Sequence, residues 1–167
     1  MKRLFLFAIL ILLSLSVYSI DNKVGEYMGI KFGTSMEDTK ELLSKKYEDI
    51  LSLGNTIILN TIIDDIDVMV TFSFFEDKFY LVYVSTKEPT AYDAFLYLLI
   101  LKYGQPTDST ESDLTRSYST TWDQGKFEIC LREISSDTET FVAIKYSDKN
   151  LMRKAMKDLL KEDLNKM

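Results

Sequence analysis

Apolar and polar residues alternate through the middle of the chain, from Val68 to Phe75. Even-numbered positions carry Val or Phe, whereas the odd-numbered positions from 69 to 73 carry Met, Thr and Ser. A period of two is typical of a strand with one buried face. Two β-prone runs flank it at 55–63 and 78–85, and the gaps hold the acidic pairs Asp64-Asp65 and Glu76-Asp77. Gaps of that kind favour hairpin turns, so the region predicts three antiparallel strands.

Helical periodicity precedes these strands and returns after them. Thr34 and Glu37 have the spacing of a capping box, so a first helix is predicted behind Thr34, ending near Tyr47. A second helix is predicted to follow Thr90 and to end at Gly104, because Gly favours a helix C-cap and a proline follows shortly after. The remaining predicted elements are strands near 115–122, 126–134 and 140–146 and a C-terminal helix from about Asp148.

The order of helix, three strands, helix, three strands and helix predicts the fold class. We expect a two-layer α+β fold in which an antiparallel sheet of about six strands has its helices on one face. A shift of 56 positions places Thr34 on Thr90 and Lys46-Tyr47 on Lys102-Tyr103. This match suggests two α-β-β-β repeats, at about 27–86 and 88–147, followed by the C-terminal helix; the alternative is that two amphipathic helices match by chance. No linker separates the halves, so residues 20–167 are predicted to form a single domain.

The first nineteen residues have the pattern of a cleaved signal peptide. Lys2 and Arg3 precede an unbroken apolar run from Leu4 to Leu13, and small serines follow it. Cleavage is expected after Ser19, with Ser16 as the alternative. The apolar run is shorter than the roughly 20 residues of a spanning helix, so no stable membrane anchor is expected after cleavage. The mature protein is therefore predicted to be periplasmic or extracellular.

Composition excludes several chemistries. The chain has no histidine and one cysteine, Cys130, so it cannot form a Ser-His-Asp triad, a His-ligated metal site or an internal disulfide. Its formal net charge is −6, which falls to −8 without Lys2 and Arg3. An acidic chain without a basic patch in its sequence is a poor candidate for nucleic acid or anionic lipid, because both need clustered Lys and Arg. The cluster Asp64-Asp65-Ile66-Asp67 could ligate Ca²⁺, but a solvated hairpin turn is favoured. We expect no cofactor, no metal and no enzymatic activity.

Some segments resemble a known class of exported proteins. The element order resembles the secreted tandem α/β modules typified by β-lactamase inhibitor proteins and by small outer-membrane-assembly lipoproteins. The segments that carry the resemblance are Phe32-Gly33-Thr34-Ser35, Lys102-Tyr103-Gly104-Gln105-Pro106, Trp122 and Phe127 to Leu131. The chain departs from the lipoproteins in having no lipidated cysteine and from the inhibitors in having no disulfide pair. The resemblance implies a non-catalytic binding module and transfers no functional residue.

Aromatic residues in the predicted strands suggest where binding occurs. If the helices cover one sheet face, Tyr83, Tyr118 and Trp122 are predicted to lie on the other face and to form a binding surface. The alternative is that they fill the core or its rim. The leading function is a protein-binding or envelope-assembly module whose partner is another exported protein. A small-ligand carrier with a pocket between sheet and helices and a carboxylate-based hydrolase are the alternatives; the sequence leaves the oligomeric state open.

Overall fold

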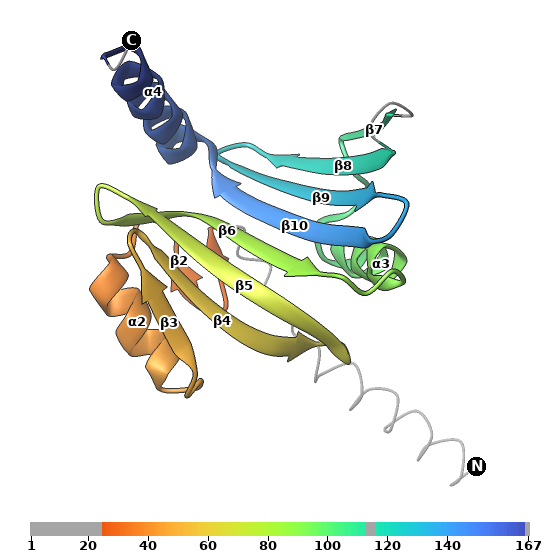
Figure 1. The fold of residues 1–167 in the computed structure, drawn as a ribbon, viewed down its shortest axis with the longest axis horizontal. Helices are drawn as coiled ribbons and strands as arrows, with labels where there is room; N and C mark the ends of the chain where they lie inside the picture. The colour runs from red at the N-terminus through yellow and green to blue at the C-terminus, as the bar shows by residue number, and fades with distance from the viewer. Residues whose placement is uncertain (1–24, 113–115, 166–167) are drawn as a thin grey trace, which may run out of the picture.

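An eight-stranded antiparallel sheet forms the body of the molecule (Figure 1). The computed structural model describes residues 25–112 and 116–165, so the predicted signal peptide lies outside the described residues. Within the described ranges, no helix is long and apolar enough to cross a membrane. The strands follow the order β3-β4-β5-β6-β10-β9-β8-β7 across the sheet. Their bounds are β3 Ile50–Leu53, β4 Thr56–Ile63, β5 Ile66–Phe75, β6 Lys78–Thr86, β7 Asp108–Ser112, β8 Ser117–Gln124, β9 Phe127–Ser135 and β10 Thr140–Asp148.

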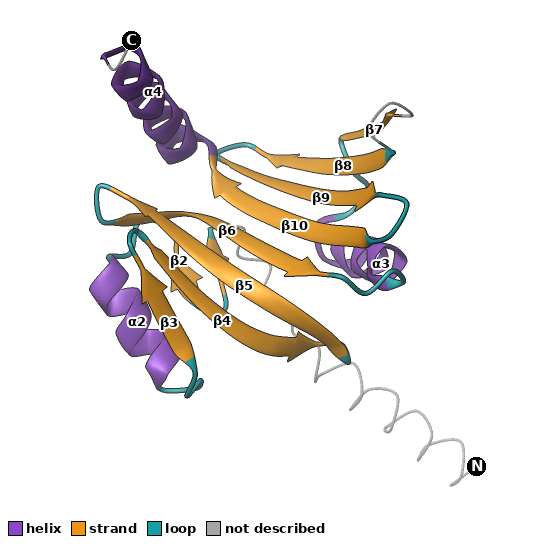
Figure 2. Ribbon diagram, viewed as in Figure 1, coloured by secondary structure: helices purple, strands orange, loops and turns teal. Residues whose placement is uncertain are grey.

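Two helices and a small hairpin cover one face of this sheet, as Figure 2 shows. The helices are α2, Met36–Ser44, and α3, Ala91–Tyr103, and the hairpin consists of β1, Glu26–Tyr27, and β2, Ile30–Lys31. Leu43 of α2 and Phe95 of α3 belong to the same buried cluster as the central strands. The alternation in the sequence explains this layer, because Val68, Val70, Phe72 and Phe74 of β5 all face it. Its sheet side consists of Ile57, Leu59, Val68, Val70, Phe72, Phe74, Phe79, Val82, Val84, Trp122, Ile129, Leu131, Val142 and Ile144.

The fold class is confirmed as α+β with an antiparallel sheet, but the expected number of about six strands is too low. Each half of the chain contributes a helix and four strands rather than three, and the two-stranded sheet of β1 and β2 is additional. The extra strands are β3 and β7, which form the two edges of the sheet. β7 has the sequence Asp-Ser-Thr-Glu-Ser, which carries no hydrophobic alternation. Backbone pairing with β8 holds this strand in place, since its own side chains are largely exposed.

The acidic pairs predicted to form hairpin turns lie in turns between strands. Asp64 and Asp65 both have positive φ, 54° and 65°, the backbone that a type I′ hairpin turn requires at both central positions. Asp tolerates this left-handed region better than most residues with a Cβ. Asp64 and Asp65 thus form the turn between β4 and β5, whereas Asp67 lies in β5 opposite Ile62. The described residues contain no group of three or more Asp, Glu, His or Cys side chains placed to hold a metal ion.

The helix boundaries differ from the prediction at both ends of α2. Ser35, not Thr34, is the N-cap: its Oγ accepts a hydrogen bond from the backbone N–H of Asp38 at 3.1 Å. A second acceptor is Asp77 in the β5–β6 turn, whose carboxylate takes the N–H of Met36 at 2.9 Å. The helix ends at Ser44 rather than near Tyr47. The second helix begins after Thr90 as predicted, but the Thr90 hydroxyl caps no backbone N–H and donates instead to the Glu88 carboxylate at 2.9 Å.

The C-terminal helix α4, Lys149–Asn165, departs from the expectation that all helices share one face. It follows β10 directly and contacts β6 and β10. Leu81 and Ser147 are direct partners in register on the face opposite to α2 and α3. Both are buried, which shows that part of this face is covered. α4 therefore covers one end of that face and then projects beyond the sheet (Figure 1).

Candidate binding face

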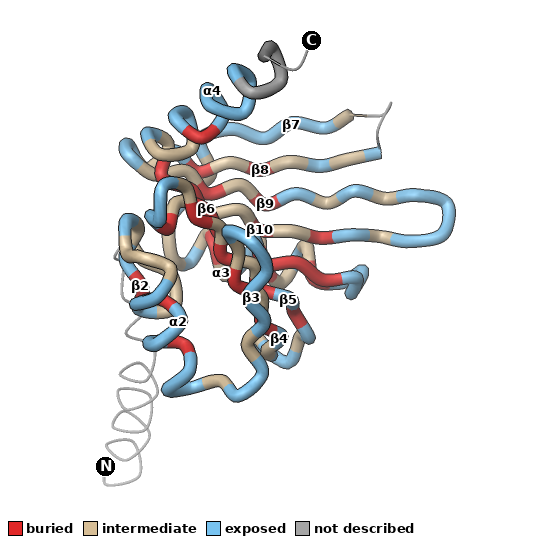
Figure 3. Tube along the Cα trace, turned by 60° about the vertical axis from the view of Figure 1, so that its left-hand side comes forward, coloured by how far each residue is buried: buried red, intermediate tan, exposed pale blue. Residues whose placement is uncertain are grey.

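The sheet face opposite to α2 and α3, here called the open face, carries an unusual number of large apolar side chains. Three strands show which residues point to it, because the neighbours of these residues face the core. They are the odd-numbered residues of β5 and β10 and the even-numbered residues of β9. Figure 3 shows the same alternation as exposed and buried segments along the strands. More than a third of each of these side chains is accessible to water: Leu51, Leu53, Ile62, Met69, Tyr83, Ile134 and Phe141.

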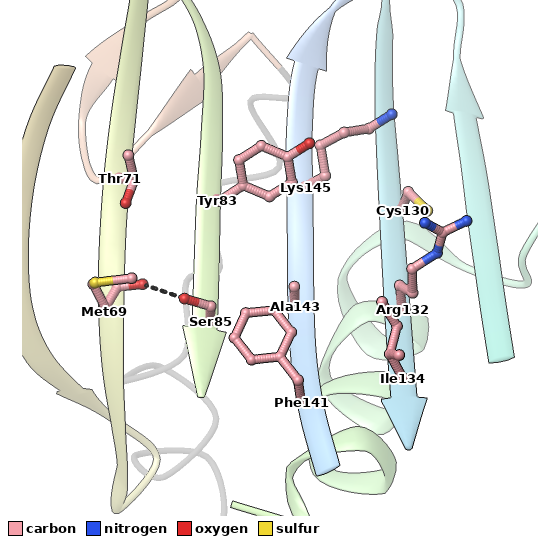
Figure 4. A pocket seen from close by; sticks show the side chains of 10 residues that line it. All are labelled: Met69, Thr71, Tyr83, Ser85, Cys130, Arg132, Ile134, Phe141, Ala143 and Lys145. Atoms are coloured by element: carbon pink, nitrogen blue, oxygen red, sulfur yellow. Dashed lines mark hydrogen bonds between the residues drawn. The ribbon is translucent and has the colours of Figure 1, made fainter. Parts of the chain in front are cut away.

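A hollow of about 480 Å³ lies at the centre of the open face. Ser85 of β6 and Ala143 of β10 are direct partners in register, and both are small, so the sheet is left uncovered at that point. Larger residues surround the two small ones: Met69 stands on one side and Phe141 on the other (Figure 4). The hollow therefore results from small side chains on adjacent central strands. Its complete lining is Met69, Thr71, Tyr83, Ser85, Cys130, Arg132, Ile134, Phe141, Ala143 and Lys145.

The hollow is apolar with a positive rim. Lys145 forms an ion pair with Glu128 at 2.6 Å on the neighbouring strand, so its charge is balanced. Arg132 is exposed and forms no ion pair with any residue that the structure describes. Its partners across the strands are the uncharged Ser119 and Ala143. None of the ten lining residues is a carboxylate, so the hollow favours an apolar ligand surface, with at most a negative charge beside Arg132.

The structure places the three predicted site residues on different faces. Tyr83 lines the hollow and is 39% exposed, as expected for the open face. Trp122 is fully buried on the helix face, where its indole N–H donates to the carbonyl of Gly104 at 2.8 Å. Tyr118 is on the helix face too, and its ring lies 6.4 Å from the ring of Tyr92 in α3. The prediction that the three share the open face is therefore wrong for Trp122 and Tyr118.

Sequence reasoning also missed residues that line the hollow. Phe141 and Ile134 are direct partners in register, and Arg132 lies beside Ala143. One signal for them was available: β10 alternates around Val142 and Ile144, which places Phe141 on the opposite parity. The lone Cys130 is a half-buried strand residue, with its Sγ 3.3 Å from the Ser119 hydroxyl.

A tyrosine cluster lies on the other side of the sheet. The rings of Tyr27 and Tyr146 are 4.9 Å apart, and the ring of Tyr103 is 6.5 Å from that of Tyr146. Burial, reinforced by the neighbouring phenols, raises the pKa of Tyr27 and of Tyr146 well above the ordinary value. Burial raises the pKa of Tyr103 to about 12. These phenols stay neutral under ordinary conditions and act as core residues with a polar tip.

Two of the functional alternatives can be located on this structure. The carrier hypothesis places a pocket between sheet and helices, whereas the hollow lies on the open face. The hydrolase hypothesis requires two convergent buried carboxylates. Among the described residues, Asp148 is the one buried acid, and its carboxylate accepts the backbone N–H groups of Asn150 and Leu151 at the start of α4. Asp148 thus has the contacts of a helix cap.

Comparison with known proteins finds a partial structural similarity and no match in sequence. No family model matches the chain, and no curated protein matches it. Among solved structures, the chain is similar to the crystal structure of YjgB, a DUF4309 family protein from Bacillus subtilis, with 10% sequence identity and a TM-score of 0.40. The match covers 69% of this chain and 78% of that chain. What this supports is a structural likeness to an uncharacterised protein, while the resemblance to inhibitor and assembly modules stays a prediction.

Proposed function

We propose that the protein is a non-catalytic binding module whose open face binds an apolar surface of another exported protein. One observation carries the proposal: large apolar side chains remain exposed on four central strands around a hollow, although the opposite face already supplies a full core. Contiguous apolar patches on single chains tend to mark contact sites, because leaving them in water is unfavourable.

The chemistry of the face suits a protein partner. Tyr83 and Phe141 offer aromatic area with few rotatable bonds, which lowers the entropy cost of association. Met69 adapts to irregular surfaces because its side chain is unbranched and flexible. The hollow would accept a projecting side chain of the partner, as the pockets around interface anchors do. The predicted signal peptide at 1–19 supports a partner in the periplasm or outside the cell.

Site-specific photocrosslinking tests this proposal. A photoreactive amino acid at position 83 or 141 should crosslink one defined exported protein, and the same group at Tyr97 on the outer side of α3 should not. Tyr97 is the matched control because it is an aromatic residue in a helix, away from the open face, and its side chain is 63% exposed. Phe141→Ala should weaken binding of the crosslinked partner about thirtyfold while the melting temperature stays near that of the parent. Equal crosslinking from positions 97 and 141 would contradict the proposal.

A small-ligand carrier is the second candidate, and Arg132 is the observation that favours it. The hollow volume of about 480 Å³ is within the range of small-molecule sites, roughly 300–1,000 Å³. An apolar acid could place its chain over Ala143 and its charge on the guanidinium of Arg132. Native mass spectrometry of the protein from its host would detect such a ligand, and Arg132→Gln should release it. A crosslinked protein partner without any bound small molecule favours the first candidate.

A further inference from the structure

The second half of α4 has an apolar strip that its own domain leaves uncovered. Ala155 is buried against the sheet, but Met156, Leu159 and Leu160 are 54%, 61% and 62% exposed. The helix contacts β6 and β10 near its start and then projects beyond the sheet (Figure 1). A packed surface helix normally turns such a strip toward its core. Here the strip faces water, so it requires a different explanation from packing.

Basic residues lie along the same strip. Arg153, Met156, Lys157 and Leu160 occupy positions i, i+3, i+4 and i+7, which places them on one side of a helix. Leu159 lies one turn beyond Ala155, whose side chain is buried, and borders the row on that side. This row of α4 alternates cationic and apolar groups and contains no acidic residue. Lys157 forms its inner edge, since it also lines a shallow hollow with Phe75 and Glu76 at the β5–β6 turn.

The cations of this row form no ion pair within the part of the chain whose side chains the structure describes. Lys149 pairs with Asp123 at 2.8 Å, a hydrogen bond that lowers the pKa of Asp123, and Lys161 lies 3.7 Å from Asp158. Arg153, Lys154 and Lys157 form no ion pair with any described residue. α4 contains five basic and three acidic residues, a net charge of +2, whereas the rest of the chain carries −8. The helix is therefore a local cationic element on an acidic protein.

We propose that this row of α4, with Leu159 beside it, docks on the anionic surface of a lipid bilayer. Met156, Leu159 and Leu160 would enter the boundary between headgroups and acyl chains, and the long side chains of Arg153 and Lys157 would reach the phosphates. Charge complementarity selects this occupant. A second copy of the chain would bring an identical basic row against the first, which disfavours pairing through this face. The proposal is independent of what the open face binds.

An environment-sensitive fluorophore on the helix tests the docking directly. In a Cys130→Ser background, Leu160→Cys carries the label, and Tyr97→Cys on α3 carries it in the matched control, because Tyr97 is equally exposed at 63%. The protein is purified in the form its host exports. The label at 160 should shift to the blue with vesicles of phosphatidylcholine and phosphatidylglycerol and not with phosphatidylcholine alone. The label at 97 should not shift with either.

Neutralising the row gives the second measurement. Arg153→Gln with Lys157→Gln should weaken partitioning to the anionic vesicles about thirtyfold, since each cation near such a surface contributes about fivefold. Lys40→Gln in α2 with Lys46→Gln just after it changes the net charge equally and should leave partitioning unchanged. No shift at position 160 with anionic vesicles, or an equal loss in the α2 control, would overturn the proposal. Concentration-dependent dimerisation abolished by Leu160→Ser, without a vesicle response, would overturn it in favour of self-association.

Discussion

At the scale of single residues, burial changes the acid–base behaviour of ordinary tyrosines. Tyr27, Tyr103 and Tyr146 have rings within 6.5 Å of a neighbour in this group, at the meeting point of β1, α3 and β10. Removing a phenol from water penalises its ionised form, and each additional phenol nearby penalises it further. The pKa of Tyr103 is raised to about 12, and the pKa values of the other two are raised as well.

This cluster predicts a loss of stability in alkali. A tyrosine in the unfolded chain ionises near pH 10, whereas Tyr103 in the folded protein keeps its proton to about 12. The stabilisation is therefore complete below about pH 10 and decreases above it, by at most about 1.4 kcal/mol per pH unit for each such group. Urea unfolding between about pH 9 and about pH 11 measures this slope, which Tyr27→Phe should reduce. Tyrosinate absorption from these phenols near pH 10 in the folded protein would contradict the assignment.

Single residues also show why the site was predicted only in part. Tyr118 and Trp122 share the parity of Thr120 on β8, and Thr120 is buried while its neighbours are serines and threonines. Because both parities of this strand are rich in small polar residues, the pattern does not assign a face, and only pairing with the apolar β9 does so. Tyr83 was placed correctly because Val82 and Val84, on either side of it, mark the core face of β6.

At the scale of elements, a hydrogen bond from Trp122 of β8 to the Gly104 carbonyl joins this strand to the C-terminal end of α3. Gly104 has φ of 80° and ψ of −162°, a backbone conformation that is essentially restricted to glycine, and it directs the chain from α3 toward β7. The Trp122 indole holds the Gly104 carbonyl in that position at 2.8 Å. The indole ring also fills the core beneath Ile129, its partner on β9.

Two substitutions separate these roles of Trp122. Trp122→Ala removes a fully buried ring and should lower the free energy of unfolding by about 3–5 kcal/mol. Trp122→Phe retains an aromatic ring but leaves the Gly104 carbonyl unpaired, which should cost about 1–3 kcal/mol. Urea unfolding followed by far-ultraviolet circular dichroism measures both. An alanine variant within about 1 kcal/mol of the parent would mean that the ring is not a core element.

Elements with a strong hydrophobic period were predictable, and those without one were not. β5 and β9 were located from alternation alone, and α3 from its apolar residues and its glycine end. β7 escaped prediction because its residues are all polar, and β3 because four residues are too few to display a period. The placement of α4 was missed because its amphipathic pattern fits packing on the sheet and an outward strip equally well.

At the scale of the whole molecule, the two halves of the chain share one core across the seam between β6 and β10. Val84 lies beside Ile144 and Val82 beside Tyr146 in the register of these strands. The N-terminal hairpin also bridges the halves, because the ring of Tyr27 lies 6.1 Å from that of Phe72 and 4.9 Å from that of Tyr146. Neither half can bury its apolar face without the other. The internal similarity of the halves thus need not mean that either is an independent folding unit.

The shared core predicts one cooperative unfolding transition for residues 20–167. Trp122 reports only on the second half, whereas far-ultraviolet circular dichroism reports on the strands of both halves. If the halves unfold together, the two probes should give the same urea midpoint, as two-state behaviour requires. A chain restricted to 88–165 should remain unfolded, because it loses the β6 edge and the Tyr27 and Phe32 rings that cover β10 and Phe127. Separate midpoints for the two probes, or a folded fragment, would show two domains instead of one.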